Sequence, residues 1–331
     1  MIDRLMNSIE RLSAPIVVGL DPTPDIVPEV FFLDAAKSEG ESPGAGAAAL
    51  LRFNQEIIDA VAGVVPAVKP NIAFYERYGL EGIRAYIKTT EYAVDKGLMV
   101  IGDIKRGDIG STAAAYAGHL EPAALFGEKF EIWSEDAVTL NPYLGEDSIR
   151  PFLDVMNGRD KGIFILVKTS NPGSADIQDL LVNDSRYNLR YNLRYDSRHD
   201  SRGGDGFTSE PYPLYEHVAG LVSEWGEAEG LMGEQGYSKV GAVVGATHPE
   251  TGAKLRDLMP HTFFLVPGYG AQGAGAKDVR RFFDADGRGS IVNSSRGIIG
   301  AWKTEDKGSA GVGEAAHSAA IRMRDELSAV L

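Results

Sequence analysis

One stretch of the sequence concentrates residues that can do acid–base chemistry. Asp103 and Lys105 stand two positions apart at the end of a short apolar run, and Asp108 and Thr112 follow them. A strand turns alternate side chains to the same face, so Asp103 and Lys105 should share a face. Lys69 ends the preceding apolar run, which would bring it alongside if the two runs are neighbouring strands.

These residues predict an array of alternating charge, Lys–Asp–Lys–Asp. Alternation lets ammonium and carboxylate groups stay ionised inside a cleft. Such an array is costly to build unless every charge is paired. Its use would be to hold a carboxylate against a substrate and an ammonium group as a proton donor. Two ordinary salt bridges at the rim of the fold would have the same spacing.

Two glycine-rich loops indicate a phosphate site. One apolar run leads into 267–275 (PGYGAQGAG), and the last run leads into 293–298 (NSSRGI). Loops of this kind expose backbone N–H groups, and a following helix adds the positive end of its dipole. Arg296 adds a cation of forked geometry. Turn glycines alone would look similar, but two such loops with an Arg favour phosphate binding.

Composition excludes several classes of protein. The 331 residues include no cysteine, which rules out disulfides, zinc–thiolate sites, iron–sulfur clusters and Cys nucleophiles. The six histidines have neither HxH nor HExxH spacing, so we predict no metal site. A formal charge of −14 argues against nucleic-acid binding. No run of 18 apolar residues and no secretory signal are found, so we expect no membrane association and a cytoplasmic location.

The elements that must position these residues alternate along the chain. Short apolar runs typical of strands buried on both faces lie at 16–21, 66–69, 98–104, 136–140, 162–168, 240–246, 262–267 and 290–293. Helical patterns lie near 45–63, 79–96, 110–126, 146–157, 212–235, 248–258, 276–284 and 311–330. Each strand is therefore followed by a helix.

Eight strand–helix units predict an α/β fold, a closed (β/α)₈ TIM barrel that forms a single domain over 1–331. An open doubly wound sheet is the structural competitor. In a barrel the reacting groups lie at the carboxyl ends of the strands, and the loops after strands seven and eight are a recurrent phosphate site. The charged residues and the glycine-rich loops fall at those ends. His248 heads the sixth strand–helix loop, where it could touch substrate or cap a helix.

Two segments look inserted. Residues 34–46 are small, polar and glycine-rich, and they predict a surface loop. Residues 184–202, in the fifth strand–helix connection, repeat Arg at every fourth position and resemble a low-complexity loop. We expect this insertion to be mobile and dispensable. An Arg- and Tyr-rich flap that attracts an anion near the barrel mouth is the alternative.

The sequence resembles the orotidine 5′-monophosphate decarboxylases, in particular the longer subfamily of many bacteria and archaea. The matching stretches are VGLDPTPD (18–25), VKPNIAFYERYG (68–79), IGDIKRGDIGSTAAAYA (101–117), TLNPYLGEDSIRPFL (139–153), VKTSNPGS (167–174), PGYGAQGA (267–274) and NSSRGI (293–298). They cover the barrel except parts of the helices and the two insertions. The DxKxxD motif with its upstream Lys is the most specific of them.

The resemblance implies decarboxylation of orotidine 5′-monophosphate to uridine 5′-monophosphate, the last step of de novo pyrimidine synthesis, with no metal and no organic cofactor. It implies a catalytic tetrad of Lys69, Asp103, Lys105 and Asp108. It also implies a homodimer with shared active sites, in which Asp108 and Thr112 reach into the neighbouring subunit's site. Four further residues are implied to bind substrate: Asp21 the ribose, Ser170 the pyrimidine, and Gln272 and Arg296 the phosphate.

Two rival functions remain open. A sugar-phosphate lyase or synthase of the same barrel superfamily would share the Asp-x-Lys pair but would use Mg²⁺. A barrel that binds a phosphorylated ligand without turnover is the non-enzymatic alternative. The KPNIAFYERYG and NPYLGEDS stretches count against the first, and the intact tetrad counts against the second.

Overall fold

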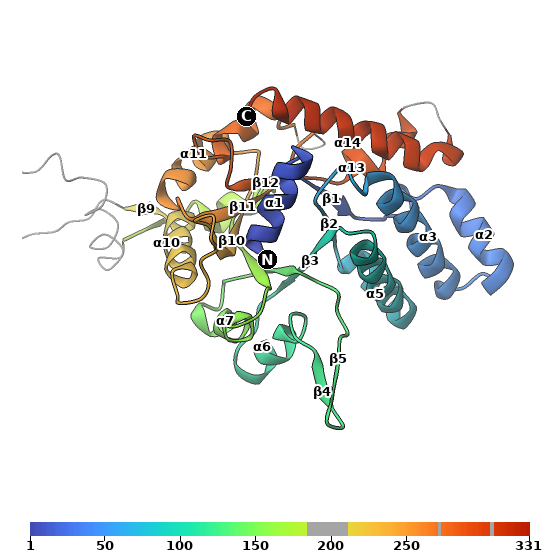
Figure 1. Ribbon diagram of the computed structural model, residues 1–331, viewed down its shortest axis with the longest axis horizontal. Coiled ribbons are helices and arrows are strands. Elements are labelled where there is room, and N and C mark those ends of the chain that lie inside the picture. Colours follow the sequence, from blue (N-terminus) through green and yellow to red (C-terminus); the bar gives the residue numbers. More distant parts are fainter. Residues whose placement is uncertain (184–210, 271–272, 305–307) are drawn as a thin grey trace, which may run out of the picture.

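The computed structural model describes residues 1–183, 211–270, 273–304 and 308–331. Eight parallel strands close into a barrel in the order β1-β12-β11-β10-β7-β6-β3-β2 (Figure 1). They are β1 (Ile16–Leu20), β2 (Ala67–Pro70), β3 (Met99–Arg106), β6 (Ala137–Leu140), β7 (Gly162–Lys168), β10 (Ser238–Val244), β11 (Thr262–Pro267) and β12 (Ser290–Ser294). The predicted barrel is confirmed, and an open sheet is excluded.

Helices surround the barrel (Figure 1). They are α1 (Ile2–Leu12), α2 (Glu29–Glu39), α3 (Pro43–Val61), α4 (Ala73–Glu76), α5 (Gly79–Asp95), α6 (Gly110–Ala117), α7 (Arg150–Met156), α8 (Ala175–Gln178), α10 (Leu214–Gly226), α11 (Pro249–Leu258), α12 (Ala276–Val279), α13 (Arg296–Ile299) and α14 (Val312–Ser328). Short 3₁₀ turns are η1 (Glu146–Ser148), η2 (Pro172–Ser174), η3 (Arg280–Phe282), η4 (Ala301–Lys303) and η5 (Ser309–Gly311). Within the described ranges, none of these helices has the length and apolar character needed to cross a bilayer.

The barrel interior is filled at its amino-terminal end by α1, which crosses the strands in Figure 1. Ile2, Leu5 and Met6 of α1 join a buried cluster with inward-facing residues such as Val17 and Phe164. Burying these side chains supplies hydrophobic stabilisation on the order of 1.5–3 kcal/mol each. The amino-terminal end of the barrel interior is therefore filled by apolar side chains.

The predicted surface loop at 34–46 is wrong, because most of it is helical. The helix α2 runs to Glu39, and its Phe31 and Ala35 are buried in the main core. Ser42 then caps α3 by accepting a hydrogen bond from the Ala45 N–H at 3.1 Å. A Ser–Pro start is a strong helix signal that the glycine-rich composition obscured.

The helix predicted over 110–126 is also too long. The helix α6 ends at Ala117, and an antiparallel hairpin of β4 (Ala123–Leu125) and β5 (Glu128–Phe130) follows it. The two turn residues of the hairpin, Phe126 and Gly127, both have positive φ, as the favoured two-residue hairpin turn requires. The hairpin projects from the body of the protein in Figure 1.

The predicted insertion at 184–202 lies outside the described residues. The chain on either side of it forms a small antiparallel pair, β8 (Leu181–Val182) with β9 (Tyr212–Pro213). In the sequence, this pair lies between β7, the fifth strand of the barrel, and the helix α10.

Candidate functional site

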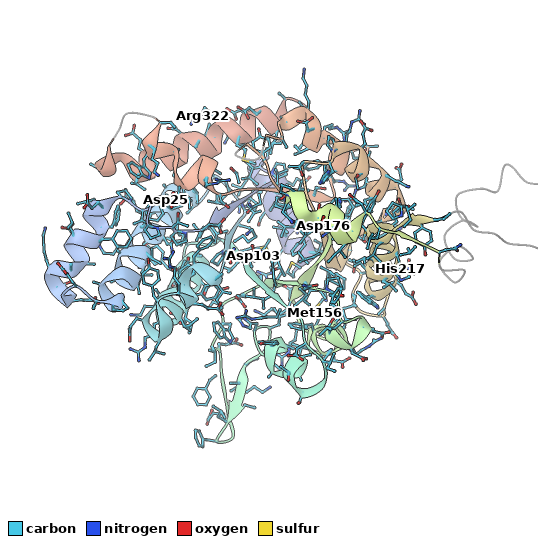
Figure 2. The ribbon with its side chains drawn as sticks, turned by 180° about the vertical axis from the view of Figure 1, so that it is seen from behind. Asp25, Asp103, Met156, Asp176, His217 and Arg322 are labelled. Atoms are coloured by element: carbon cyan, nitrogen blue, oxygen red, sulfur yellow. The ribbon has the colours of Figure 1, made fainter. Side chains whose placement is uncertain are left out.

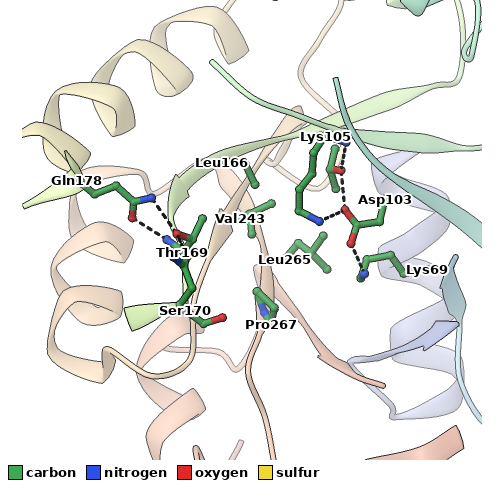
Figure 3. A pocket seen from close by; sticks show the side chains of 12 residues that line it. Lys69, Asp103, Lys105, Leu166, Thr169, Ser170, Gln178, Val243, Leu265 and Pro267 are labelled. Carbon is green, nitrogen blue, oxygen red and sulfur yellow. Dashed lines mark hydrogen bonds and ion pairs between the residues drawn. The ribbon is translucent and has the colours of Figure 1, made fainter. Parts of the chain in front are cut away.

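A cavity of about 410 Å³ opens at the carboxyl end of the barrel (Figure 3). Its walls come from six strands and from the segment after β7. The lining residues are Lys69, Asp103, Lys105, Thr139, Leu166, Thr169, Ser170, Asn171, Gln178, Val243, Leu265 and Pro267. Figure 2, drawn from the other side of the molecule, shows Asp103 in the middle of the barrel. The site thus lies where a (β/α)₈ barrel is expected to carry one.

Asp103 is shared between two lysines. Its Oδ2 accepts a hydrogen bond from Lys69 Nζ at 2.5 Å, and its Oδ1 accepts one from Lys105 Nζ at 2.5 Å. Lys69 and Asp103 are buried, with side chains 6% and 7% exposed, whereas Lys105 is 47% exposed. The buried pair is therefore fixed in place, and Lys105 is the ammonium group that stays accessible from the cavity.

The backbone at this cluster departs from a regular strand. Between Gly102 and Arg106 on β3, the partner strand β6 advances only from Val138 to Leu140, so β3 bulges. Lys105 lies at φ 45°, in the left-handed region, where a residue other than glycine costs about 1–3 kcal/mol. Asp103 and Lys105 do reach one cavity, as predicted, but a bulge rather than simple alternation brings them there.

Thr139 of β6 holds this bulge together. Its Oγ1 accepts a hydrogen bond from the Lys105 backbone N–H at 3.0 Å and donates one to Asp103 Oδ1 at 2.9 Å. Sequence analysis missed this residue. A signal was present, because Thr139 is the polar residue of an otherwise apolar strand and lies two positions from the inward-facing Ala137.

Electrostatics keep this cluster ionised. Burial by itself would raise the pKa of Asp103, but the charges of Lys69 and Lys105 and their hydrogen bonds hold that pKa well below its ordinary value. Burial likewise disfavours the charged form of Lys69, yet the negative charges of Asp103 and Asp21 raise the pKa of Lys69 above its ordinary value. The pair is therefore charged across the physiological pH range.

Asp108 and Thr112 lie apart from the cluster. The Asp108 carboxylate accepts a hydrogen bond from the Ile109 N–H at 2.8 Å, and Thr112 is exposed on α6. Neither residue lines the cavity. Within one chain the structure thus brings together three members of the predicted Lys–Asp–Lys–Asp array, and the fourth lies on the loop after β3.

Of the predicted substrate-binding residues, Ser170 lines the cavity. Asp21 follows β1, and its Oδ1 is buried with no hydrogen-bond partner among the described residues. Ser170 lines the cavity on the wall opposite Asp103 (Figure 3). Arg296 is exposed at the start of α13, and Gln272 lies outside the described residues.

Two further polar residues lie at or near the ends of barrel strands. The Lys168 side chain is 2% exposed, and its Nζ pairs with Asp179 at 2.6 Å and lies 5.5 Å from the Tyr215 ring centre. His248 is at the start of α11 but makes no side-chain cap, and its Nε2 is buried without a partner among the described residues. Neither residue lines the cavity.

The described residues hold no group of three or more His, Asp or Glu side chains arranged to bind a metal ion. A buried polar cluster of Tyr86, Glu135 and His119 packs against Gly102 of β3. Tyr86 Oη donates a hydrogen bond to Glu135, and His119 Nδ1 lies 2.7 Å from the other carboxylate oxygen. Its members are buried and satisfied by one another. That the reaction needs no cofactor remains a prediction.

Fold and site together define a class: (β/α)₈ barrels with a cavity at the carboxyl ends of the strands, lined by paired charged side chains of β2 and β3. Comparison with known proteins specifies it further. Residues 14–310 match the model of the orotidine 5′-phosphate decarboxylase / HUMPS family. Two relatives named orotidine 5′-phosphate decarboxylase come from Rhodopirellula baltica (43% identity over 307 residues, 92% of this chain and 89% of the relative) and Clostridium acetobutylicum (40% over 331 residues, 100% of both). A solved structure of OMP decarboxylase from Leishmania donovani superposes with a TM-score of 0.66 at 30% identity, covering 99% of this chain and 97% of the other.

This chain belongs to the orotidine 5′-phosphate decarboxylase / HUMPS family. The resemblance seen in the sequence is thereby confirmed over nearly the whole chain.

Proposed function

We propose that this chain decarboxylates orotidine 5′-monophosphate to uridine 5′-monophosphate and CO₂, the final step of de novo UMP synthesis. Its membership of the family and the names of its full-length relatives support the activity. The observation that carries the chemistry is the buried, ionised Asp103 with a half-exposed Lys105 ammonium bonded to it on the wall of the cavity.

The reaction needs a group that stabilises negative charge and then gives up a proton. When the bond from C6 of the pyrimidine to its carboxylate breaks, CO₂ leaves and the electron pair stays on C6. Lys105 stabilises that charge and donates a proton from Nζ to C6, which yields UMP. Water then returns a proton to the neutral amine. The exposure of Lys105 supports this role, because the donor must reach both substrate and solvent.

Asp103 is proposed to lie beside the departing carboxylate. Two negative charges brought together in a dry site repel, and the repulsion falls as neutral CO₂ leaves. Lys69 offsets the cost of burying Asp103 and keeps it ionised. The low pKa of Asp103 supports this arrangement, because a protonated Asp would exert no such repulsion.

Remote contacts would hold the rest of the nucleotide. The unpartnered Asp21 Oδ1 supports a role as acceptor for a ribose hydroxyl, since a buried carboxylate oxygen otherwise costs free energy. Ser170 is proposed to bond the pyrimidine. Gln272 and Arg296 are proposed to hold the phosphate, whose binding energy is then expressed at the reacting carbon.

We also propose that the functional unit is a homodimer with shared active sites. The fourth member of the tetrad, Asp108, lies outside the cavity of its own chain, and Thr112 is exposed nearby on α6. Ile109 between them is an apolar residue that is 52% exposed. In a dimer that covers this rim, the partner's Asp108 would complete the charge cluster. The phosphorylated substrate does not cross membranes unaided, so we place the reaction in the cytoplasm.

One assay tests the proposal. The loss of orotidine monophosphate absorbance is followed with purified protein in excess EDTA. Turnover without metal supports the decarboxylase. Turnover that requires Mg²⁺ would instead indicate the lyase or synthase alternative, and nucleotide binding without turnover would indicate an inactive binding barrel. The last two outcomes each contradict the proposal.

A further inference from the structure

The side chain of Gln178 is committed to one neighbour. Its Oε1 accepts a hydrogen bond from the Thr169 backbone N–H at 2.9 Å, and its Nε2 donates one to Thr169 Oγ1 at 2.8 Å. Both bonds are visible in Figure 3, on the wall opposite Lys69, Asp103 and Lys105. Gln178 is also partly buried, whereas the other three residues of the short helix α8 are exposed. The amide therefore acts as a two-point clamp on the segment that follows β7.

The clamp extends along the segment that carries Ser170. Thr169 Oγ1 donates a hydrogen bond to Asn171 Oδ1 at 2.7 Å, so the residues on both sides of Ser170 are tied together. On the other side, the Ser170 carbonyl accepts a hydrogen bond from Thr247 Oγ1 at 3.3 Å. A Cβ on Gly245, the residue after β10, would come within 2.7 Å of the Ser170 nitrogen, which shows how closely the segment packs against this backbone.

The helix that carries the clamp is itself anchored. Asp179 follows Gln178 directly and pairs with the buried Lys168 at 2.6 Å. Two consecutive residues of the α8 region thus bond two consecutive residues at the end of β7. A four-residue helix has little stability of its own, so these tertiary bonds are what hold Gln178 in position.

We propose that Gln178 is a positioning residue for recognition of the pyrimidine base. It holds the 169–171 segment so that Ser170 meets the polar edge of the ring in a fixed orientation. A contact on a segment that is already ordered loses less conformational entropy when ligand binds. This inference rests on the proposed function, because it takes Ser170 as the contact to the base.

The test separates binding of the base from binding of the sugar phosphate. Affinities for UMP and for ribose 5-phosphate are measured by calorimetry with the wild-type protein and with Gln178→Ala. We expect UMP binding to weaken about tenfold, which corresponds to about 1.4 kcal/mol. Ribose 5-phosphate, which lacks the base, should bind both proteins equally. In turnover, KM for orotidine monophosphate should rise by about the same factor while kcat stays within about threefold.

Two further variants sharpen the result. Gln178→Glu keeps an acceptor for the Thr169 N–H but has no donor for Thr169 Oγ1, so its UMP affinity should fall between wild type and Gln178→Ala. If Gln178→Ala does not fold, the affinities of Gln178→Glu for the two ligands provide the test instead. Gln235→Ala is the matched control, because Gln235 bonds Asn7 and Asp3 of α1 at the opposite end of the barrel. This control should bind both ligands as wild type does.

The outcomes distinguish the two proposals. A wild-type protein that does not turn over orotidine monophosphate overturns the proposed function, whether or not it binds UMP. If the wild type is active, the inference about Gln178 is overturned by an unchanged UMP affinity in Gln178→Ala. It is overturned equally by a parallel loss of UMP and ribose 5-phosphate binding, which would indicate general damage to the site.

Discussion

Lys69 and Lys105 both bond the Asp103 carboxylate, and their different solvent exposure suits them to different roles. Lys69 is buried with Asp103 and balances its charge, whereas Lys105 is half exposed to the cavity. A buried ion pair adds little net stability, but each charge allows its partner to stay ionised away from solvent. Lys105 is therefore the residue free to act on a ligand.

Replacing Lys105 with alanine tests this division of work. We expect Lys105→Ala to lower kcat by at least about 10²–10⁴-fold, the usual contribution of a general acid. Binding of ribose 5-phosphate should change little, because Lys105 is proposed to act at C6 of the pyrimidine, which ribose 5-phosphate lacks. Steady-state kinetics and calorimetry provide the two readings. A variant that keeps most of its activity would remove Lys105 as the proton donor.

The ionisation of Asp103 predicts a pH dependence of stability. Its folded-state pKa lies below the ordinary value of 3.8, so the ionised carboxylate stabilises the fold above that pH. The stabilisation is lost as pH falls toward the folded-state pKa. Urea unfolding from pH 7 downward should therefore show wild type more stable than Asp103→Asn at pH 7, with the difference shrinking below about pH 4. A difference that stays constant down to pH 2 would contradict the assigned pKa direction.

At the scale of elements, the position of β3 depends on contacts at Gly102 as well as on the contacts inside the barrel. Gly102 immediately precedes Asp103, and a Cβ there would come within 2.2 Å of Glu135 Oε1 and 3.0 Å of Tyr86 Oη. The carboxylate and the phenol are buried and bonded to each other. The absence of a side chain at Gly102 lets β3 pack against this polar cluster. This packing sets the position of the next residue, Asp103.

A methyl group at Gly102 should disturb both the fold and the site. We expect Gly102→Ala to lower the free energy of unfolding by about 1–3 kcal/mol, because the closest neighbour is a buried carboxylate. Activity should fall with it, since β3 must shift. Gly313→Ala in α14 is the matched control, because its Cβ would meet nothing closer than 3.4 Å. Urea unfolding of both variants gives the comparison, and equal stability would contradict the proposed role of Gly102.

At the scale of the whole molecule, one chain brings together three of the four members of the predicted Lys–Asp–Lys–Asp array. The barrel brings Lys69, Asp103 and Lys105 together, while Asp108 remains on the loop outside the cavity. The shared-site proposal can be tested because each complete site would draw on two chains.

Mixing two inactive variants tests the shared site. In a random mixture of Lys105→Ala and Asp108→Asn subunits, half of the dimers are mixed, and one of their two sites is intact. Activity should therefore recover to about a quarter of the wild-type value. The measurement is turnover after the two variants are unfolded and refolded together, with each variant refolded alone as the control. No recovery, with mixed dimers shown to form, would contradict a site shared between subunits.

Much of this could be predicted from the sequence, because the relevant signals are local. Eight short apolar runs ending in polar or glycine-rich segments predicted the barrel and the end at which its site lies. The spacing of Asp103 and Lys105 predicted their shared cavity. Errors occurred where local composition misleads: the glycine-rich start of α3 looked like a loop, and the hairpin after α6 looked like helix.

Other features depend on contacts between residues distant in the chain, and only the tertiary structure decided them. Thr139 braces Asp103 and Lys105 from another strand, 36 and 34 positions away. Gln178 clamps Thr169 through a short helix with no pattern of its own. Periodicity reports which face a residue occupies, but it carries no information about which partner lies opposite. That information arises when the barrel closes and brings the strand ends together.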